Sequence, residues 1–576
     1  MPKRQLSILA AGLYFVASLG GCDGFIMKKP EPPVPEVVVP PHVAGTITEY
    51  ARLETGGNCL VGSFGLVVGL GKNGSSQVPP DLLDYFKQYL FLHNIGSARA
   101  GTDVLAPERM LRDLDTAIVR VDGAIPPGAP PGTKFDVHVG ALPTTDTKNL
   151  DGGALLPSEM RLAVGGVVVP GGPTKPMATA GGDTFLNPFL DPNKPQDLVK
   201  QREGRIIGGG SVLEANPIRL LLYQADHARA QHIQRRLNER FGEREPVASA
   251  KSSSAIEVTV PRSHRANYEH FLQLVMHLPM VMNQGAAEAH ARHIAEAMPL
   301  PTADHNELAL VWEAIGKQSL PIVQGLYASR NPSVAFHAAR TGLRLEDESL
   351  AGDVILRFAE SGGSPLQISA IEELGRAPGF LRASAVLHKL IDDENDLVRV
   401  AAYEAMLRRG DRSLITRVDV GKQFALDLVS SGRSYAIYAT QTREPRIVLF
   451  GKDMAVCRPV YFDLPDDLVI VRAYREDEKL TIFRRIPRTG KYSDTFQTDF
   501  SVRTLITTLG LPSQRGPGGN IMGLNFSYGQ VVRILYRMCK AEDINARFVL
   551  QPLPGIQRIY TDVGVGTVGR PDTPSQ

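Results

Sequence analysis

The stretch NCLVGSFGLVVGLGKNGSS, residues 58–76, runs from apolar residues into a glycine-rich turn. Its leucines and valines have the composition of a buried strand, and the turn reads Gly69-x-Gly71-x-x-Gly74. The same spacing is the letter pattern of a dinucleotide-binding turn, in which glycines let the backbone approach a pyrophosphate. The stretch is therefore either a nucleotide site or a structural connection between two elements.

The residues after Gly74 argue against a nucleotide site. A dinucleotide turn needs a helix that begins at the third glycine, because the helix N-terminus attracts the phosphates. Here SSQVPP intervenes, so a helix can begin only near Asp81, and residues 96–111 hold no strand that would supply a ribose-binding acid. Lys72 is not followed by Ser or Thr, which excludes a Walker A loop. A tight strand-to-turn connection is the better interpretation.

The N-terminus has the pattern of a bacterial secretion signal. Two basic residues precede a mostly apolar run of roughly 14 residues, which is too short to span a bilayer stably. The run ends in LGGC, which resembles a bacterial lipobox and predicts lipidation of Cys22 after removal of residues 1–21; the alternative is a plain signal peptide with an incidental cysteine. Residues 22–45 are rich in proline and predict an extended tether. We expect a periplasmic protein, lipid-anchored to the inner or the outer membrane.

The composition limits the function classes. A chain of 576 residues is too long for one core, and its net charge of +2 gives no sign of a nucleic-acid partner. With Cys22 lipidated, Cys59, Cys457 and Cys539 remain, which allows at most one intramolecular disulfide and leaves open whether any forms. The default for each is an isolated buried thiol.

The first part of the body, residues 46–280, alternates apolar runs with glycine and proline. The patterns predict strands at 61–69, 116–122, 134–142, 218–223 and 255–260, with helices at 81–94, 226–241 and 264–276. Residues 165–200 are loop-like. The arginines at 229, 235, 236 and 240 lie largely off the apolar stripe of their helix, so we expect a solvated face there rather than a binding face.

The rest of the chain changes character twice. Residues 286–415 are all-helical in pattern, and Ala338, Ala370 and Ala402 mark similar helices about 32 residues apart, a period typical of stacked helical hairpins. Residues 416–563 are β-rich, and 564–576 predict a disordered tail. The fold class is thus multidomain α+β, with mixed α/β domains, an all-α HEAT-like repeat array and a β-rich C-terminal domain.

Residues with catalytic potential are sparse. His290 and His293 lie one helical turn apart and His305 follows, so a metal site is conceivable, but no cysteine or carboxylate pair stands at ligand spacing. Surface histidines are the default. No His-Glu-x-x-His or Gly-x-Ser-x-Gly motif occurs, although a triad assembled from distant segments stays open. We expect no cofactor, no metal and no enzymatic activity.

The opening stretch resembles the flagellar P-ring protein family. Matching positions are Asn58, Leu60, Gly62, Gly65, Leu66, Val67, Val68, Gly69, Leu70 and Gly74. The likeness continues in order at 111–142 (with Asp136), 149–161 (with Gly152 and Gly153), 204–214 and 220–242, and it resumes faintly at 445–460. Five collinear matches rarely recur by chance, so we expect residues 46–280 to be P-ring-like. The helical residues 286–415 are foreign to the family pattern, and the match at 445–460, if it holds, makes them an insertion.

The resemblance implies a non-enzymatic, ring-forming subunit around the flagellar rod. Its expected partners are further copies of itself, other envelope or flagellar rod proteins and peptidoglycan, with a membrane contact through the lipid and no nucleic acid. The lipobox and the helical array depart from the family pattern. The alternative is therefore a monomeric, lipid-anchored adaptor whose repeats bind a protein partner, unrelated to flagella.

Overall fold

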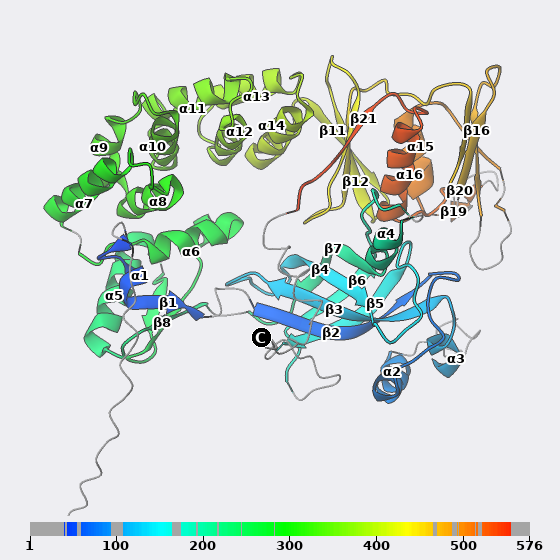
Figure 1. Ribbon diagram of the computed structural model, residues 1–576, viewed down its shortest axis with the longest axis horizontal. Coiled ribbons are helices and arrows are strands. Elements are labelled where there is room, and N and C mark those ends of the chain that lie inside the picture. Colours follow the sequence, from blue (N-terminus) through cyan, green and yellow to red (C-terminus); the bar gives the residue numbers. More distant parts are fainter. Residues whose placement is uncertain are drawn as a thin grey trace, which may run out of the picture.

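The structure is a computed structural model that describes residue 40 and residues 43–54, 59–93, 107–163, 174–191, 194–215, 218–242, 245–281, 283–464, 469–485, 492–493, 495–512, 514–515 and 521–553. The signal segment 1–21, Cys22, most of the tether, Asn58 and the tail 564–576 lie outside the described residues. Within them, a barrel lies below the C-terminal sheets, a small α/β unit lies to the side, and helices α7–α14 run across the top between them (Figure 1).

A closed barrel of six strands is formed around the opening stretch. The strands pair in the order β2-β3-β4-β7-β6-β5, and their bounds are β2 (Cys59–Val68), β3 (Thr116–Ile125), β4 (Lys134–Ala141), β5 (Ala154–Leu162), β6 (Ala178–Asp183) and β7 (Glu203–Val212). Alternate residues of β4 are buried, as a sheet with one inward face requires. Helices α2 (Pro80–Leu92) and α3 (Pro107–Leu111) cover part of the outside, where Phe86 packs near Leu66 and Ile118.

A small α/β unit contains the P-ring-like stretch 220–242. Its sheet has the order β1-β8-β10-β9, formed by β1 (Ala51–Leu53), β8 (Ile218–Leu222), β9 (Ala248–Ala250) and β10 (Ala255–Val258). Around it lie α1 (Ile47–Tyr50), α5 (His227–Phe241), η4 (Arg262–Asn267) and α6 (Tyr268–Met276), whereas α4 (Pro195–Lys200) lies beside the barrel. Asp226 begins α5, because its side chain accepts hydrogen bonds from the amides of Ala228 and Arg229.

Helices follow one another from Gln284 to Arg409. Their bounds are α7 (Gln284–Ala297), α8 (His305–Ile315), η5 (Lys317–Ser319), α9 (Leu320–Gln324), α10 (Pro332–Arg344), α11 (Leu350–Glu360), α12 (Gln367–Arg376), α13 (Arg382–Leu390) and α14 (Asp396–Arg409). Ala338, Ala370 and Ala402 lie on α10, α12 and α14 and are fully buried. The small side chain in each helix lets the neighbouring helices approach.

The C-terminal part has two sheets with helices between them (Figure 1). The first has the order β11-β12-β14-β13-β21, from β11 (Ile415–Val420), β12 (Phe424–Val429), β13 (Ala436–Ala439), β14 (Arg446–Phe450) and β21 (Arg547–Leu550). The second is β15 (Val460–Asp463), β16 (Val469–Ala473), β17 (Leu480–Arg484) and β18 (Phe496–Thr498), and a short pair is β19 (Gln514–Arg515) with β20 (Ile521–Met522). Between the sheets lie α15 (Val502–Gly510) and α16 (Tyr528–Lys540).

Two expectations from the sequence are wrong. The loop-like segment 165–200 contains β6 and α4, because short, glycine-interrupted strands such as ATAGGD carry little apolar signal. The arginine face of α5 is not wholly solvated. Arg236 is only 9% exposed, and Arg240 donates from Nε and Nη2 to the carbonyls of Ala314 and Glu313, both at 3.0 Å. These bonds satisfy the C-terminal end of α8 and join the small α/β unit to the helices.

Candidate functional site

The glycine turn after β2 is a structural connection. Gly69 and Gly71 have φ of 85° and 66°, a left-handed conformation that glycine adopts without strain. The amide of Gly71 donates to Oδ1 of Asp115 at 2.6 Å, and the amide of Gly74 donates to the carbonyl of Leu114 at 2.7 Å. The turn thus lies against the residues that precede β3, and its amides are used within the protein rather than for a phosphate.

Position 74 requires glycine, because other backbone atoms approach it closely. A Cβ at Gly74 would lie 2.5 Å from the carbonyl oxygen of Leu114 and deep inside the contact distance of the Thr116 carbonyl. Both neighbours are backbone atoms, which cannot rotate away. The strand-to-turn interpretation of the sequence is confirmed for this segment.

The glycine pair Gly152 and Gly153 lies beside the glycine turn after β2. Val67 and Val68 of β2 pair with Leu155 and Ala154 of β5, which places the residues before β5 next to the turn. A Cβ at Gly153 would meet Cγ1 of Val67 at 2.5 Å. Gly152 faces the other way, since a Cβ there would lie 2.5 Å from Nε2 of Gln530 on α16. The structure therefore brings the two motifs together at one end of the barrel, against the C-terminal part of the same chain.

Asp136 makes a second contact between the barrel and the C-terminal part. Its Oδ1 accepts from the amide of Gly208 at 2.7 Å and from the amide of Arg443 at 3.0 Å. Gly208 has φ of 61°, and a Cβ there would lie 2.7 Å from the carbonyl oxygen of Arg443. Of the other motif residues, Leu66, Val67 and Leu70 are buried, whereas Leu60 is 48% exposed.

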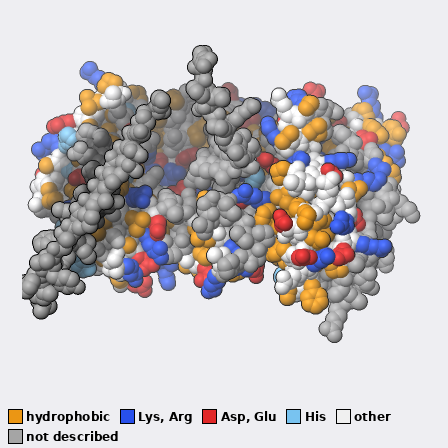
Figure 2. All heavy atoms as spheres, turned by 60° about the horizontal axis from the view of Figure 1, so that its bottom comes forward, with side chains coloured by type: hydrophobic (Ala, Val, Ile, Leu, Met, Phe, Trp, Pro, Cys, Tyr) orange, Lys and Arg blue, Asp and Glu red, His pale blue; other side chains and the backbone are white. Residues whose placement is uncertain are grey.

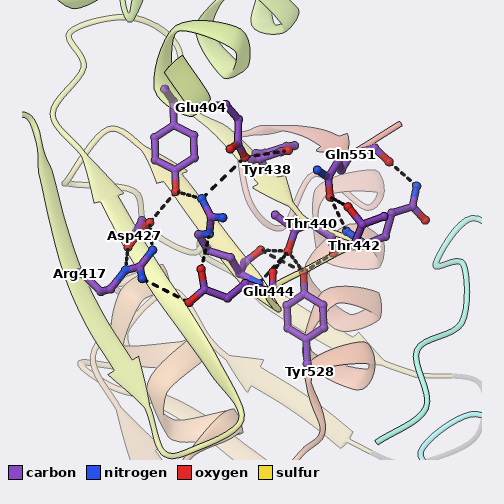
Figure 3. A network of polar contacts seen from close by, with 12 residues as sticks. Glu404, Arg417, Asp427, Tyr438, Thr440, Thr442, Glu444, Tyr528 and Gln551 are labelled. Atoms are coloured by element: carbon purple, nitrogen blue, oxygen red, sulfur yellow. Dashed lines mark hydrogen bonds and ion pairs between the residues drawn. The ribbon is translucent and has the colours of Figure 1, made fainter. Parts of the chain in front are cut away.

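The segment that carries Arg443 is held by a polar network (Figure 3). The hydroxyl of Tyr528 on α16 donates to the carbonyls of Thr440 at 2.6 Å and Arg446 at 3.0 Å. The backbone N–H of Gln441 donates to Oε1 of Gln551 at 3.0 Å. Burial raises the pKa of Tyr528, so its hydroxyl stays a donor at neutral pH. The barrel therefore contacts a rigid hairpin connection rather than a free loop.

The same network fixes the last helix of the array to the C-terminal sheet (Figure 3). The carboxylate of Asp427 is fully buried and accepts from Nε and Nη2 of Arg417 at 2.8 and 3.0 Å. It also accepts from the hydroxyl of Tyr403 on α14 at 2.5 Å. Nη1 of Arg446 donates to that hydroxyl at 2.9 Å. A buried carboxylate that accepts from three groups favours one packing of the helix on the sheet.

A second polar chain runs along the helices from the small α/β unit. Nε2 of His270 on α6 lies 2.7 Å from Oε2 of Glu313 on α8. Arg344 on α10 donates to Glu313 at 2.9 Å and to Glu373 on α12 at 2.6 Å. Burial opposes the charge of Glu313, but Arg344 and His270 outweigh it and lower the pKa of Glu313 to about 2. The chain joins four helices through charged groups that water hardly reaches.

Residues considered for chemistry do not converge. His290 and His293 lie on α7 and His305 begins α8, and the described part of the chain holds no group of three His, Cys, Asp or Glu that could bind a metal ion. Cys59, Cys457 and Cys539 are free thiols; Cys59 is buried, whereas Cys457 is exposed, unlike the buried thiol expected for it. Among the described residues no helix is long and apolar enough to cross a membrane.

Residues 47–288 match the family described as Flagellar P-ring protein. We call residues 47–288 the P-ring region, after the family to which their sequence is similar. Flagellar P-ring proteins of Bradyrhizobium sp. and Geobacter sulfurreducens are 30% identical over 244 residues and 27% identical over 350 residues, which are 40% and 57% of this chain. That of Thermotoga petrophila is 28% identical over 222 residues, or 37% of this chain.

The P-ring region does not account for the whole protein. The chain spans 59% of the Bradyrhizobium relative, 60% of the Thermotoga relative and 86% of the Geobacter relative. The family match ends within α7, so most of the helical array and the residues that face the P-ring glycines, Gln530 and Arg443, lie outside it. Those partners were missed from the sequence. One available signal was the stretch SYGQ at 527–530, a capping box that begins α16.

Proposed function

We propose that the protein is a non-enzymatic structural subunit of a bacterial envelope assembly of the flagellar P-ring type. The match of residues 47–288 to the P-ring family carries this proposal. In it, lipidation at Cys22 anchors the chain to a membrane in the periplasm, and the P-ring region forms a ring with further copies. Rod or other envelope proteins and peptidoglycan are the proposed partners.

We propose that the helical array is a HEAT-like addition that binds a partner or acts as a spacer. Its helices α9, α11 and α13 border a groove of about 870 Å³ lined by residues such as Leu350, Val354 and Val386. This groove supports the alternative function, a monomeric lipid-anchored adaptor that binds a protein through its repeats. The two functions differ in the oligomeric state that they require.

Mass measurement after gentle solubilisation of the full-length protein separates these functions. A large, symmetric, discrete oligomer supports the ring, and electron microscopy of the same sample would display its symmetry. A stable monomer at concentrations well above those in the envelope contradicts the ring and favours the adaptor.

The lipid anchor has its own test. A Cys22→Ala variant should leave the membrane fraction and appear in the soluble periplasmic fraction, because one anchor of several acyl chains supplies the membrane affinity. A Cys457→Ala variant is the matched control and should stay with the membrane. A Cys22→Ala variant that still fractionates with membranes contradicts lipidation.

A further inference from the structure

A cavity lies where the glycine turn, the loop after β6, α4 and α16 meet. Its volume is about 220 Å³. Asn73 from the turn, Lys148 from the segment before β5, Gln201 after α4, and Arg533 and Arg537 from α16 are among its lining residues. Its walls thus come from both the P-ring region and the C-terminal part, and they are held together by the ion pair between Arg533 and Asp151 at 2.8 Å.

Several polar side chains that line this cavity have no hydrogen-bond partner among the residues that the structure describes. Gln201 is 9% exposed, yet its side-chain amide makes no hydrogen bond with any residue that the structure describes. Neither the side-chain amide of Asn73 nor the ammonium of Lys148 is bonded within the described part of the chain. These groups are available to pair with a ligand that donates and accepts hydrogen bonds.

The charged residues that line the cavity leave an excess of positive charge. Asp151 neutralises Arg533, while Lys148 and Arg537 have no carboxylate opposite them among the lining residues. Arg537 donates one hydrogen bond to the carbonyl of Leu190 at 3.3 Å and has further N–H donors available. A planar guanidinium and an ammonium that line one cavity suit a carboxylate.

The remaining wall is apolar. Leu186, Leu198 and Leu464 face the cavity together with Pro188. The volume is below the 300–1,000 Å³ that is typical of pockets for drug-sized ligands, so the ligand has about one or two amino-acid residues. The cavity thus offers side-chain amides, a cationic end and an apolar wall. One class of molecule has groups that match all three.

We propose that this cavity binds the carboxylate end of a short peptide with a small apolar side chain. The carboxylate lies between Lys148 and Arg537, and the backbone amide of the peptide pairs with Gln201 and Asn73. The side chain packs on the leucines. Because the walls come from two parts of the chain, the ligand stabilises their contact as well as its own position.

The probe is acetyl-alanyl-alanine, titrated into full-length solubilised protein by calorimetry or ligand-observed NMR. Its C-terminal amide has the same shape without the charge and should bind at least tenfold more weakly. Inorganic phosphate is the third arm. Phosphate that binds as tightly as the peptide and displaces it identifies a general anion site and overturns the peptide proposal, as does equal binding of the acid and the amide.

The variants Lys148→Gln and Arg537→Gln should each weaken peptide binding about tenfold or more, since each removes a charge-assisted bond. Lys540→Gln is the matched control, because it removes an exposed charge from the same helix without touching the cavity. Lys148 is exposed, so its variant should melt like the wild type even if Arg537→Gln unfolds. No detectable binding of the acid, or unchanged binding in Lys148→Gln, overturns the proposal.

Discussion

At the scale of single residues, glycine is required at position 74 of the opening stretch because neighbouring atoms occupy the space that a side chain would fill. Gly74→Ala should destabilise the protein by about 3 kcal/mol or more, because the new methyl group would overlap two backbone carbonyls. Urea or thermal unfolding measures the loss.

Gly132→Ala is the control for this variant. Gly132 also has a positive φ, 87°, but no atom lies within 4 Å of its Cβ position. Its loss should therefore be about 1 kcal/mol, from backbone strain alone. Equal losses in the two variants would show that overlap with the carbonyls of Leu114 and Thr116 is not what requires Gly74.

Residue patterns predicted the local role of this stretch but not its partners. The apolar run and the late helix start were enough to predict a strand ending in a turn, because both depend on neighbours in sequence. Asp136 and Arg443 are separated by 307 residues, and no periodicity connects them. The contact of Gly152 with Gln530 is hidden for the same reason.

At the scale of elements, regular apolar spacing was sufficient to predict helices and strands. Strands with little apolar spacing were missed. The helix predicted at 226–241 is α5, and the strand at 116–122 is the first part of β3. The strand β6 was missed, since two of its six residues are glycine and its pairing with β5 and β7 supplies what its own sequence lacks. The polar chain through α8, α10 and α12 was also missed, because helical periodicity ranks charged residues as exposed.

Glu313 makes that polar chain pH-dependent. Its folded pKa of about 2 lies below the ordinary value of 4.5. The stability it contributes is therefore present above about pH 4.5 and is lost as the pH falls toward 2. The shift corresponds to about 3 kcal/mol.

Glu313→Gln should lower the free energy of unfolding at pH 7 by about 3 kcal/mol, because Arg344 loses a buried counter-charge. Unfolding curves from pH 7 to 2 should also show a flatter acid decline than the wild type. Glu346→Gln is the control, since its ion pair with Lys317 is exposed and should contribute little. A variant that keeps the wild-type pH slope contradicts the role of Glu313.

At the scale of the whole molecule, one face exposes large apolar side chains. Figure 2 shows hydrophobic side chains gathered on the face where α2 lies. Phe91 and Leu92 at the end of α2 are 79% and 68% exposed, which is unusual for such large side chains. If subunits of the proposed ring meet at this face, Phe91→Asp should shift the solubilised protein toward smaller species without changing its melting temperature.

The control for this prediction is Leu381→Asp on the helical array, where the side chain is 81% exposed. It should leave the oligomer unchanged, because the array lies away from the proposed contact. Light scattering coupled to size-exclusion chromatography measures both variants. The reverse result, loss of the oligomer in Leu381→Asp alone, would place self-association on the helices.

The P-ring region shares its cores with the rest of the chain. Leu310 and Ala314 of α8 lie in the core of the small α/β unit, and Phe185 from the barrel stacks on Tyr528 with ring centroids 5.6 Å apart. A fragment of residues 43–288 would expose these apolar surfaces to water. It should therefore unfold at a lower temperature than the full chain, and its amides near Gly152 and Gly208 should exchange faster. Equal protection of those amides in the fragment and in the full chain would mean that the barrel is stable alone and that the C-terminal part only rests on it.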